Sequence, residues 1–226
     1  MNLVDRYLLT KSNVIRILEK WYIGHKYQID NRLSPIHFEG NMLKDNNLLP
    51  KRLDRNTIYE SDYVCLYTDK VQLPSGYVIE KYHQLHYPHN AVSIVIFNEK
   101  NEILMIREKR YTVGRLEWEI PAGRMENGES KEEAARREAM EETGCSLKDL
   151  RFLCSQNPAN GMSDQVCHVF AAKVESESDI QDVDEVADKV WVPIDEVKNL
   201  LRENRTMDGV SILAILYALE FYKYDV

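Results

Sequence analysis

A stretch of 23 residues from Gly123 to Cys145 constrains this chain more than any other part of the sequence. It reads GRMENGESKEEAARREAMEETGC, a glycine-containing loop followed by a short helical segment. Ser130 and Glu133 have the spacing of a capping box, in which each residue satisfies a free backbone donor at a helix start. Gly144 follows the last predicted turn, where a left-handed residue commonly ends a helix. The spacing therefore predicts a helix between Ser130 and Gly144.

Three carboxylates share one face of this predicted helix. Glu138, Glu141 and Glu142 stand at positions i, i+3 and i+4, which are neighbours on a helix surface. One interpretation is a solvated helix with Glu–Arg pairs, which is common on protein surfaces. The other is a site for a hard divalent cation such as Mg²⁺, which prefers oxygen ligands and relieves the repulsion between the acids. Beside a glycine loop, such a cluster suits a metal-bound phosphate substrate.

The spacing of the whole stretch resembles the signature of the Nudix hydrolase family. Gly123 is followed after five residues by Glu129, and after seven more by the run REAMEETGC from Arg137 to Cys145. Ala139 and Cys145 depart mildly, because the family usually has a larger aliphatic residue at both positions. The resemblance implies an α/β fold, a Nudix α/β/α sandwich with a mixed central sheet. It also implies hydrolysis of a nucleoside diphosphate linked to another moiety, with dependence on Mg²⁺ or Mn²⁺.

The resemblance also assigns roles to residues of this stretch. It implies that the metal is bound by the backbone carbonyl of Ala122 and by the carboxylates of Glu138, Glu141 and Glu142, which are then catalytic. Four further residues are expected to support this segment structurally: Gly123, Glu129, Arg137 and Gly144. Among these, Glu129 and Arg137 are expected to form an ion pair that orients the helix.

The segment before the signature narrows the resemblance to one subgroup. MIREKRYTVGRLEWEIPAGR is similar to ADP-ribose pyrophosphatases, in which a strand ending in arginine precedes a Trp-Glu-x-Pro-Ala-Gly run. Guanidinium groups match oxyanions bidentately, so Arg107, Arg110 and Arg115 are candidates for binding phosphate or ribose, and Arg110 matches the family's substrate arginine best. Surface charges flanking a strand are the alternative. Trp118 and Glu119 are also predicted to bind substrate, and the carboxylate of Glu119 suits a metal or a sugar hydroxyl.

A loop after the signature carries the predicted general base. NPANGMSD contains Pro158, Gly161 and Asp164, which approximate the proline, glycine-rich turn and acid of the ADP-ribose pyrophosphatases without matching their spacing. Because the signature carboxylates are expected to hold metal, an acid outside the helix is needed to accept a proton from water. Asp164 is the predicted base. The alternative is that Asp164 only caps the loop.

The chain before the signature divides into three predicted parts. Residues 1–55 form an extension of unknown role with a helical apolar stripe between residues 14 and 22. Residues 56–90 alternate around a Pro-Ser-Gly turn and predict an N-terminal antiparallel sheet, and residues 91–226 form the catalytic core. In the family subgroup this sheet is often exchanged between subunits, which implies a homodimer.

Composition excludes several classes of partner. The net charge of −8 over 226 residues disfavours nonspecific binding to nucleic acid or to anionic membranes. No apolar run approaches the length of a membrane span, and residues 1–11 lack the apolar core of a signal peptide. The four cysteines lack CxxC spacing and indicate buried thiols. We therefore expect a cytoplasmic protein that binds neither nucleic acid nor membrane.

Taken together, the motifs favour an enzyme that converts ADP-ribose to AMP and ribose 5-phosphate. Other substrates within the same reaction class are GDP-mannose, diadenosine polyphosphates and nucleoside triphosphates, although the N-terminal sheet and the WEIPAG run argue against a bare triphosphatase. A sensor that binds a nucleotide sugar without cleaving it is the alternative from another class. The intact signature and the acidic chain argue against that sensor.

Overall fold

A computed structural model describes residues 48–179 and 182–222 of the chain. These residues belong almost entirely to a compact unit that begins at Pro50, six residues before the predicted start of the Nudix domain at residue 56. The helical stripe predicted between residues 14 and 22 lies outside the described residues.

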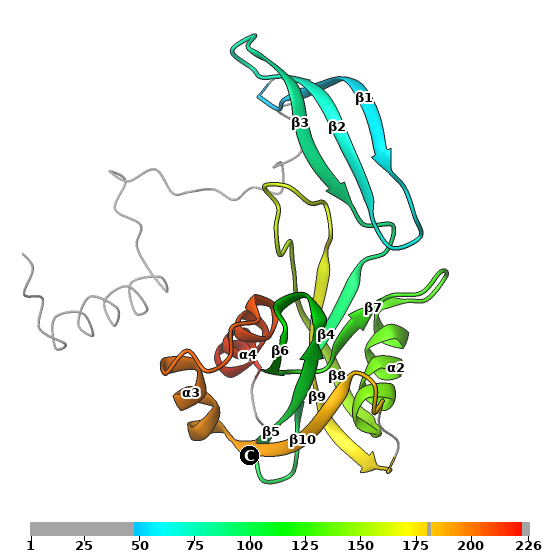
Figure 1. Cartoon of the computed structure of the whole chain (residues 1–226). Coiled ribbons are helices and arrows are strands. Elements are labelled where there is room, and N and C mark those ends of the chain that lie inside the picture. Colours follow the sequence, from blue (N-terminus) through cyan, green and yellow to red (C-terminus); the bar gives the residue numbers. More distant parts are fainter. Residues whose placement is uncertain (1–47, 180–181, 223–226) are drawn as a thin grey trace, which may run out of the picture. The chain divides into compact units, whose positions relative to one another are not determined.

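The N-terminal part of this unit is a three-stranded antiparallel sheet in the order β1-β2-β3 (Figure 1). Its strands are β1 (Lys51–Tyr59), β2 (Cys65–Gln72) and β3 (Val78–His86). The turn predicted at Pro74-Ser75-Gly76 connects the last two. β1 begins at Lys51, earlier than predicted. The sequence did not indicate this start because eight of the nine residues of β1 are exposed, so the segment shows no alternation of buried and exposed positions.

The second sheet has seven strands and forms the centre of the molecule. Its strands are β4 (Ala91–Phe97), β5 (Glu102–Arg110), β6 (Arg115–Glu119), β7 (Ala122–Arg124), β8 (Cys145–Gln156), β9 (Cys167–Glu177) and β10 (Val186–Pro193). The main order is β10-β5-β4-β9-β8, with β6 paired to β5 and β7 paired to β4. Only β4 and β9 pair in parallel, so the sheet is mixed, as predicted.

Helices cover both faces of this sheet (Figure 1). On one face α2 (Lys131–Thr143) packs the small side chains of Ala134, Ala135 and Ala139 against the sheet. On the other face α3 (Ile194–Arg202) and α4 (Gly209–Phe221) form a separate core through Val197 and Ile215. A short 3-10 helix, η1 (Tyr111–Val113), connects β5 to β6. The architecture confirms the predicted α/β class and α/β/α sandwich.

Two connections bring distant parts of the chain together near the signature. β7 pairs with β4, which places Gly123 opposite Val92 and fixes the loop before α2 against the central sheet. Hydrogen bonds join the loop between β8 and β9 to β3: the Tyr82 hydroxyl donates to the Gly161 carbonyl at 2.8 Å, the Leu85 N–H donates to the Met162 carbonyl at 2.8 Å, and His86 Nδ1 lies 2.7 Å from Asp164 Oδ2. Within the described ranges, no helix combines the length and the apolar composition needed to cross a bilayer.

Candidate active site

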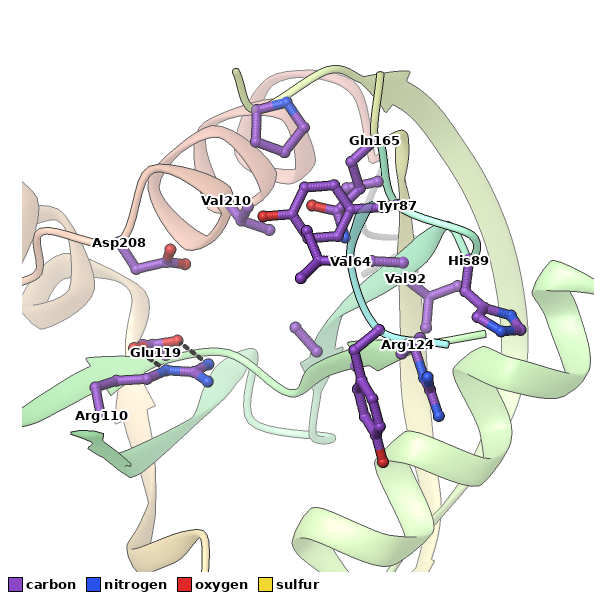
Figure 2. A pocket seen from close by; sticks show the side chains of 16 residues that line it. Val64, Tyr87, His89, Val92, Arg110, Glu119, Arg124, Gln165, Asp208 and Val210 are labelled. Atoms are coloured by element: carbon purple, nitrogen blue, oxygen red, sulfur yellow. Dashed lines mark hydrogen bonds and ion pairs between the residues drawn. The ribbon is translucent and has the colours of Figure 1, made fainter. Parts of the chain in front are cut away.

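A cavity of about 500 Å³ lies where β7, the β8–β9 loop and the start of α4 meet the end of the N-terminal sheet. Its size is that of a small-molecule site. Figure 2 shows Tyr87 and Val210 over one side, Arg110 and Glu119 at one end, and Arg124 and His89 toward the other. The signature contributes Ala122, Gly123 and Arg124 to the lining. The cavity therefore combines an apolar wall with charged groups at both ends.

The signature helix begins and ends as its sequence predicts. The Ser130 side chain accepts the Glu133 backbone N–H, and the Glu133 side chain accepts the Ser130 backbone N–H, which completes the capping box. Gly144 ends the helix at φ 69°, in the left-handed region that glycine adopts without steric cost. These two ends fix the length and the rotation of α2, and with them the direction of its carboxylates.

Two of the three predicted carboxylates reach the backbone that lines the cavity. Glu142 is buried and accepts the Ala122 N–H at 3.1 Å. The Glu138 carboxylate packs so closely on Gly123 that a Cβ at this position would lie 2.1–2.2 Å from its carboxylate atoms. Burial raises the pKa of both carboxyl groups, and the charge of Glu138 raises the pKa of Glu142 further. Glycine at position 123 is thus what allows Glu138 to approach the cavity wall.

The third carboxylate differs from this pair in being exposed, although it shares Nη1 of Arg137 with Glu138. The Glu141 side chain is 55% exposed and accepts from Arg137 at 2.9 Å. Arg137 also donates to both Glu129 oxygens, at 2.9 and 3.0 Å, and to Glu138 at 2.8 Å. A further bond joins it to the Arg124 carbonyl at 2.8 Å. Arg137 therefore links the loop before the helix to the carboxylate face, the supporting position that the sequence suggested for the Glu129–Arg137 pair.

The described residues fit a divalent cation by the chemistry of their donors. Across residues 48–179 and 182–222, no three acidic, histidine or cysteine side chains converge in a way that could hold a metal ion by themselves. Mg²⁺, however, is commonly bound by one or two carboxylates together with substrate phosphate oxygens and water. Glu138 and Glu142 supply two buried carboxylates that repel each other. The Ala122 N–H donates to Glu142 and so places the Ala122 backbone beside this carboxylate. A cation at this point would relieve the repulsion.

Arg110 lines the cavity, but its guanidinium is already engaged. Its Nε and Nη2 donate to the two oxygens of buried Glu119 at 2.9 and 2.6 Å, as Figure 2 shows. Its Nη1 lies 3.7 Å from Oε1 of Glu108. Glu108 is buried, and burial raises its pKa to about 7. The bidentate edge predicted to grip phosphate therefore holds Glu119 instead.

Three other predicted substrate residues do not line this cavity. Arg107 lies over the ring of Trp118, 5.8 Å from its centroid, and Trp118 packs against the core under α3 and α4. Arg115 forms an ion pair with Glu117. Arg107 and Arg110 are three residues apart on β5, and side chains at that spacing point to opposite faces of a strand. Only one of these two arginines can therefore face the cavity.

Asp164 joins the β8–β9 loop to the end of β3. Its Oδ2 lies 2.7 Å from Nδ1 of His86, and its Oδ1 accepts the Tyr87 N–H at 3.2 Å. Its neighbour Gln165 lines the cavity, whereas Asp164 does not. Both oxygens are thus engaged with the last residue of β3 and the residue after it, an arrangement that supports the loop-capping alternative over the general-base role.

Two variants, Asp164→Asn and His86→Ala, distinguish a loop-capping role of Asp164 from a general-base role. For a loop anchor, each variant should lower the melting temperature by about 2–4 °C, the effect of losing a half-exposed ion pair of roughly 1 kcal/mol, and each should keep kcat within about tenfold. We expect this result from kinetics and thermal unfolding of both proteins. A loss of about 10²–10⁴-fold in kcat for Asp164→Asn alone would instead make Asp164 the base.

Several residues of the cavity carry no linear motif and were not predicted. Tyr63 precedes β2, is 70% exposed, and has the Arg124 guanidinium 4.6 Å from its ring centroid. Asp208 caps α4, where its Oδ2 accepts the Ser211 N–H at 2.7 Å. Gln165 comes from the loop. Of these three, only Asp208 has a sequence signal, because an aspartate directly before an apolar helical segment indicates an N-cap. That signal predicts the cap of α4 but not that Asp208 lines a cavity.

Comparison with known proteins agrees with this geometry. The NUDIX domain family model matches residues 87–211, more than half of the chain. A methanol dehydrogenase activator from Bacillus methanolicus is 30% identical over 74% of this chain and 91% of its own length. An ADP-ribose pyrophosphatase from Bacillus subtilis (strain 168) is 30% identical over 76% of this chain and 93% of its own. The crystal structure of an ADP compounds hydrolase superposes with a TM-score of 0.68 at 24% identity, covering 76% of this chain and 93% of that one, and shows the same fold.

The intact signature on α2, the buried carboxylate pair beside a cavity and the matches over most of the chain agree with one another. The chain belongs to the Nudix family of pyrophosphohydrolases.

Proposed function

We propose that the chain hydrolyses the pyrophosphate bond of a nucleoside diphosphate sugar, and that its substrate is ADP-ribose, cleaved to AMP and ribose 5-phosphate. The observation that carries the proposal is the position of Glu138 and Glu142, two buried carboxylates on the Ala122–Gly123 wall of a cavity of about 500 Å³. The similarity to an ADP-ribose pyrophosphatase over 93% of that protein's length supports the choice of substrate.

The proposed mechanism assigns the chemistry to the carboxylate side of the cavity. A divalent cation, Mg²⁺ or Mn²⁺, when bound supplies positive charge. This charge neutralises the diphosphate oxygens and stabilises the negative charge that develops at the phosphoryl group under attack. Glu138 and Glu142 would hold it together with the Ala122 carbonyl, and Arg137 fixes the Glu138 carboxylate at 2.8 Å. Glu141, on the exposed side of the same helix, would contribute less than the other two.

The rest of the chain binds and orients the substrate. The oxygen of a water molecule forms a bond to phosphorus, the bridging P–O bond breaks with its electron pair on the departing oxygen, and the protons of the water pass to the two phosphates, which leave as a nucleoside monophosphate and a sugar phosphate. Tyr63 presents an exposed aromatic ring beside the Arg124 guanidinium, which suits stacking of a nucleobase. Arg124, at the end of the cavity opposite Glu119 (Figure 2), provides a guanidinium for the phosphates.

A substrate panel tests this proposal. ADP-ribose, GDP-mannose, a diadenosine polyphosphate and a nucleoside triphosphate are incubated with the purified chain and Mg²⁺, and the released nucleotide is quantified. We expect kcat/KM for ADP-ribose to exceed the others by at least about tenfold, a difference that pocket contacts commonly provide. A preference for GDP-mannose or the triphosphate would overturn the substrate and keep the reaction class, whereas binding of ADP-ribose with no turnover would indicate a sensor.

The homodimer implied by the family resemblance is also part of the proposal. The three-stranded sheet leaves apolar side chains exposed on its surface, among them Leu53, Ile58 and Tyr59, and such a surface favours association. Light scattering on the preparation used for the panel gives the mass that checks this assembly, and a fully active monomer would contradict it.

A further inference from the structure

One end of the cavity carries more negative than positive charge. Figure 2 shows Asp208 pointing toward the pair formed by Arg110 and Glu119. Oε1 of Glu108 lies 3.7 Å from Nη1 of the same guanidinium, and Oε2 of Glu108 is buried without a hydrogen-bond partner among the described residues. At this end the cavity lining therefore has two carboxylates, Glu119 and Asp208, and one arginine, whose bidentate edge is already taken by Glu119. This end of the cavity is unsuited to a phosphate and suited to hydroxyl donors.

Asp208 is held in place before any ligand arrives. Its Oδ2 accepts the Ser211 N–H at 2.7 Å, and the Ser211 hydroxyl oxygen accepts the Ile120 N–H at 3.1 Å. The start of α4 is thereby fixed to the segment between β6 and β7. A carboxylate has more acceptor positions than this single cap uses, and a group that is already ordered loses little entropy on binding a ligand.

The position of the proposed reaction defines which part of a ligand reaches Asp208. The diphosphate is drawn to the Glu138–Glu142 side of the Ala122–Gly123 wall, where a cation would be held. Asp208 lines the same cavity at the acidic end. A neutral group rich in hydroxyls is the chemistry that matches two fixed carboxylates, Glu119 and Asp208, and the hydroxyls of the sugar are the part of a nucleoside diphosphate sugar that meets this requirement.

We propose that Asp208 determines specificity by accepting hydrogen bonds from the sugar hydroxyls of the substrate, with Glu119 beside it. The inference rests on the proposed function and deepens it. It assigns α4 a direct part in recognition, although the first residue of that helix lies 64 positions after the end of the signature.

The test compares two compounds in Asp208→Ser. One is ADP-ribose, and the other is adenosine diphosphate that carries a plain pentyl chain in place of the terminal sugar. Serine keeps a hydroxyl acceptor for the helix cap, but it is too short to present a second oxygen to the cavity. In the wild type we expect ADP-ribose to be preferred in kcat/KM. In Asp208→Ser this preference should fall by about 10- to 100-fold, the effect of losing a hydrogen bond to a charged acceptor.

Two further variants guard against a folding effect. Asp208→Asn keeps the shape and the cap but removes the charge, so the preference should fall by a smaller factor, because charge-assisted hydrogen bonds are about twice as strong as neutral ones. Asp195→Ser is the matched control, since Asp195 lies in the first turn of α3 with a side chain 94% exposed. It should keep the wild-type preference and melting temperature.

The outcomes distinguish this inference from the proposed function. A preference unchanged in folded Asp208→Ser and Asp208→Asn, or a wild type that cleaves both compounds equally, would overturn the role of Asp208 and leave the proposed function standing. A wild type that cleaves neither compound with Mg²⁺ would contradict the proposed function and this role together. A selective loss on ADP-ribose would support both.

Discussion

Glu142→Gln should lower kcat by about 10³-fold, the size of effect seen when one preorganised electrostatic group is removed from an active site. Glu142 is 4% exposed and accepts the Ala122 N–H at 3.1 Å, so glutamine can occupy the same space and keep an acceptor oxygen. What it removes is the negative charge beside Glu138. Because that charge is the proposed ligand for the cation, activity should fall while the fold is kept.

The same substitution should raise stability in the presence of chelator. Burial and the charge of Glu138 both disfavour the ionised form of Glu142, and an uncompensated buried charge destabilises a fold. We therefore expect a higher melting temperature for Glu142→Gln than for the wild type in chelator. Addition of Mg²⁺ should raise the melting temperature of the wild type and leave that of the variant nearly unchanged.

Glu141→Gln is the matched control for this experiment. Glu141 belongs to the same helix face, but its side chain is exposed and bonded to Arg137. It should therefore lose less than about tenfold in kcat, in line with the small contribution of exposed ion pairs. Equal losses of kcat in the two variants would contradict the division between the buried pair and the exposed carboxylate. A Glu142→Gln variant that keeps full activity in the presence of chelator would remove the cation from the mechanism.

Gly123→Ala should weaken the site through Glu138 without unfolding the protein. A Cβ at this position would lie 2.1–2.2 Å from the Glu138 carboxylate, which must then move away. The clash falls on the end of a flexible side chain, so the melting temperature should change little. The Mg²⁺ concentration for half-maximal activity should rise by about 10- to 100-fold, as when groups that orient a metal ligand are lost.

Gly161→Ala provides the control for the added methyl group. No atom lies within 4 Å of a Cβ at Gly161, which is in the loop between β8 and β9, so activity and Mg²⁺ dependence should match the wild type. If Gly123→Ala also keeps the wild-type Mg²⁺ dependence, Glu138 does not hold the cation from the position that its packing on Gly123 defines.

Local patterns predicted the elements that local chemistry determines. The capping box at Ser130 and the left-handed Gly144 define the ends of α2, and both depend only on residues a few positions apart. β1 escaped prediction in its first half because its residues are exposed on both faces, so that no periodic pattern exists to be found.

The sequence predicted only those residues of the candidate site that belong to a linear motif. The signature predicted Glu138, Glu141 and Glu142 on one helix face, but it did not separate the two buried carboxylates from exposed Glu141, because burial depends on how α2 packs against the rest of the fold. Tyr63 and Asp208 line the cavity from segments 145 positions apart in sequence. Only tertiary pairing brings such residues together. The period of a strand, by contrast, already implied that Arg107 and Arg110 face opposite sides.

The most direct measurement is the release of AMP and ribose 5-phosphate from ADP-ribose by the purified chain, with Mg²⁺ and in excess chelator. The buried Glu138–Glu142 pair on the cavity wall predicts equal amounts of the two products with Mg²⁺ and a return to the uncatalysed rate in chelator. Full turnover in chelator, or no cleavage of any nucleoside diphosphate sugar with Mg²⁺, would contradict it.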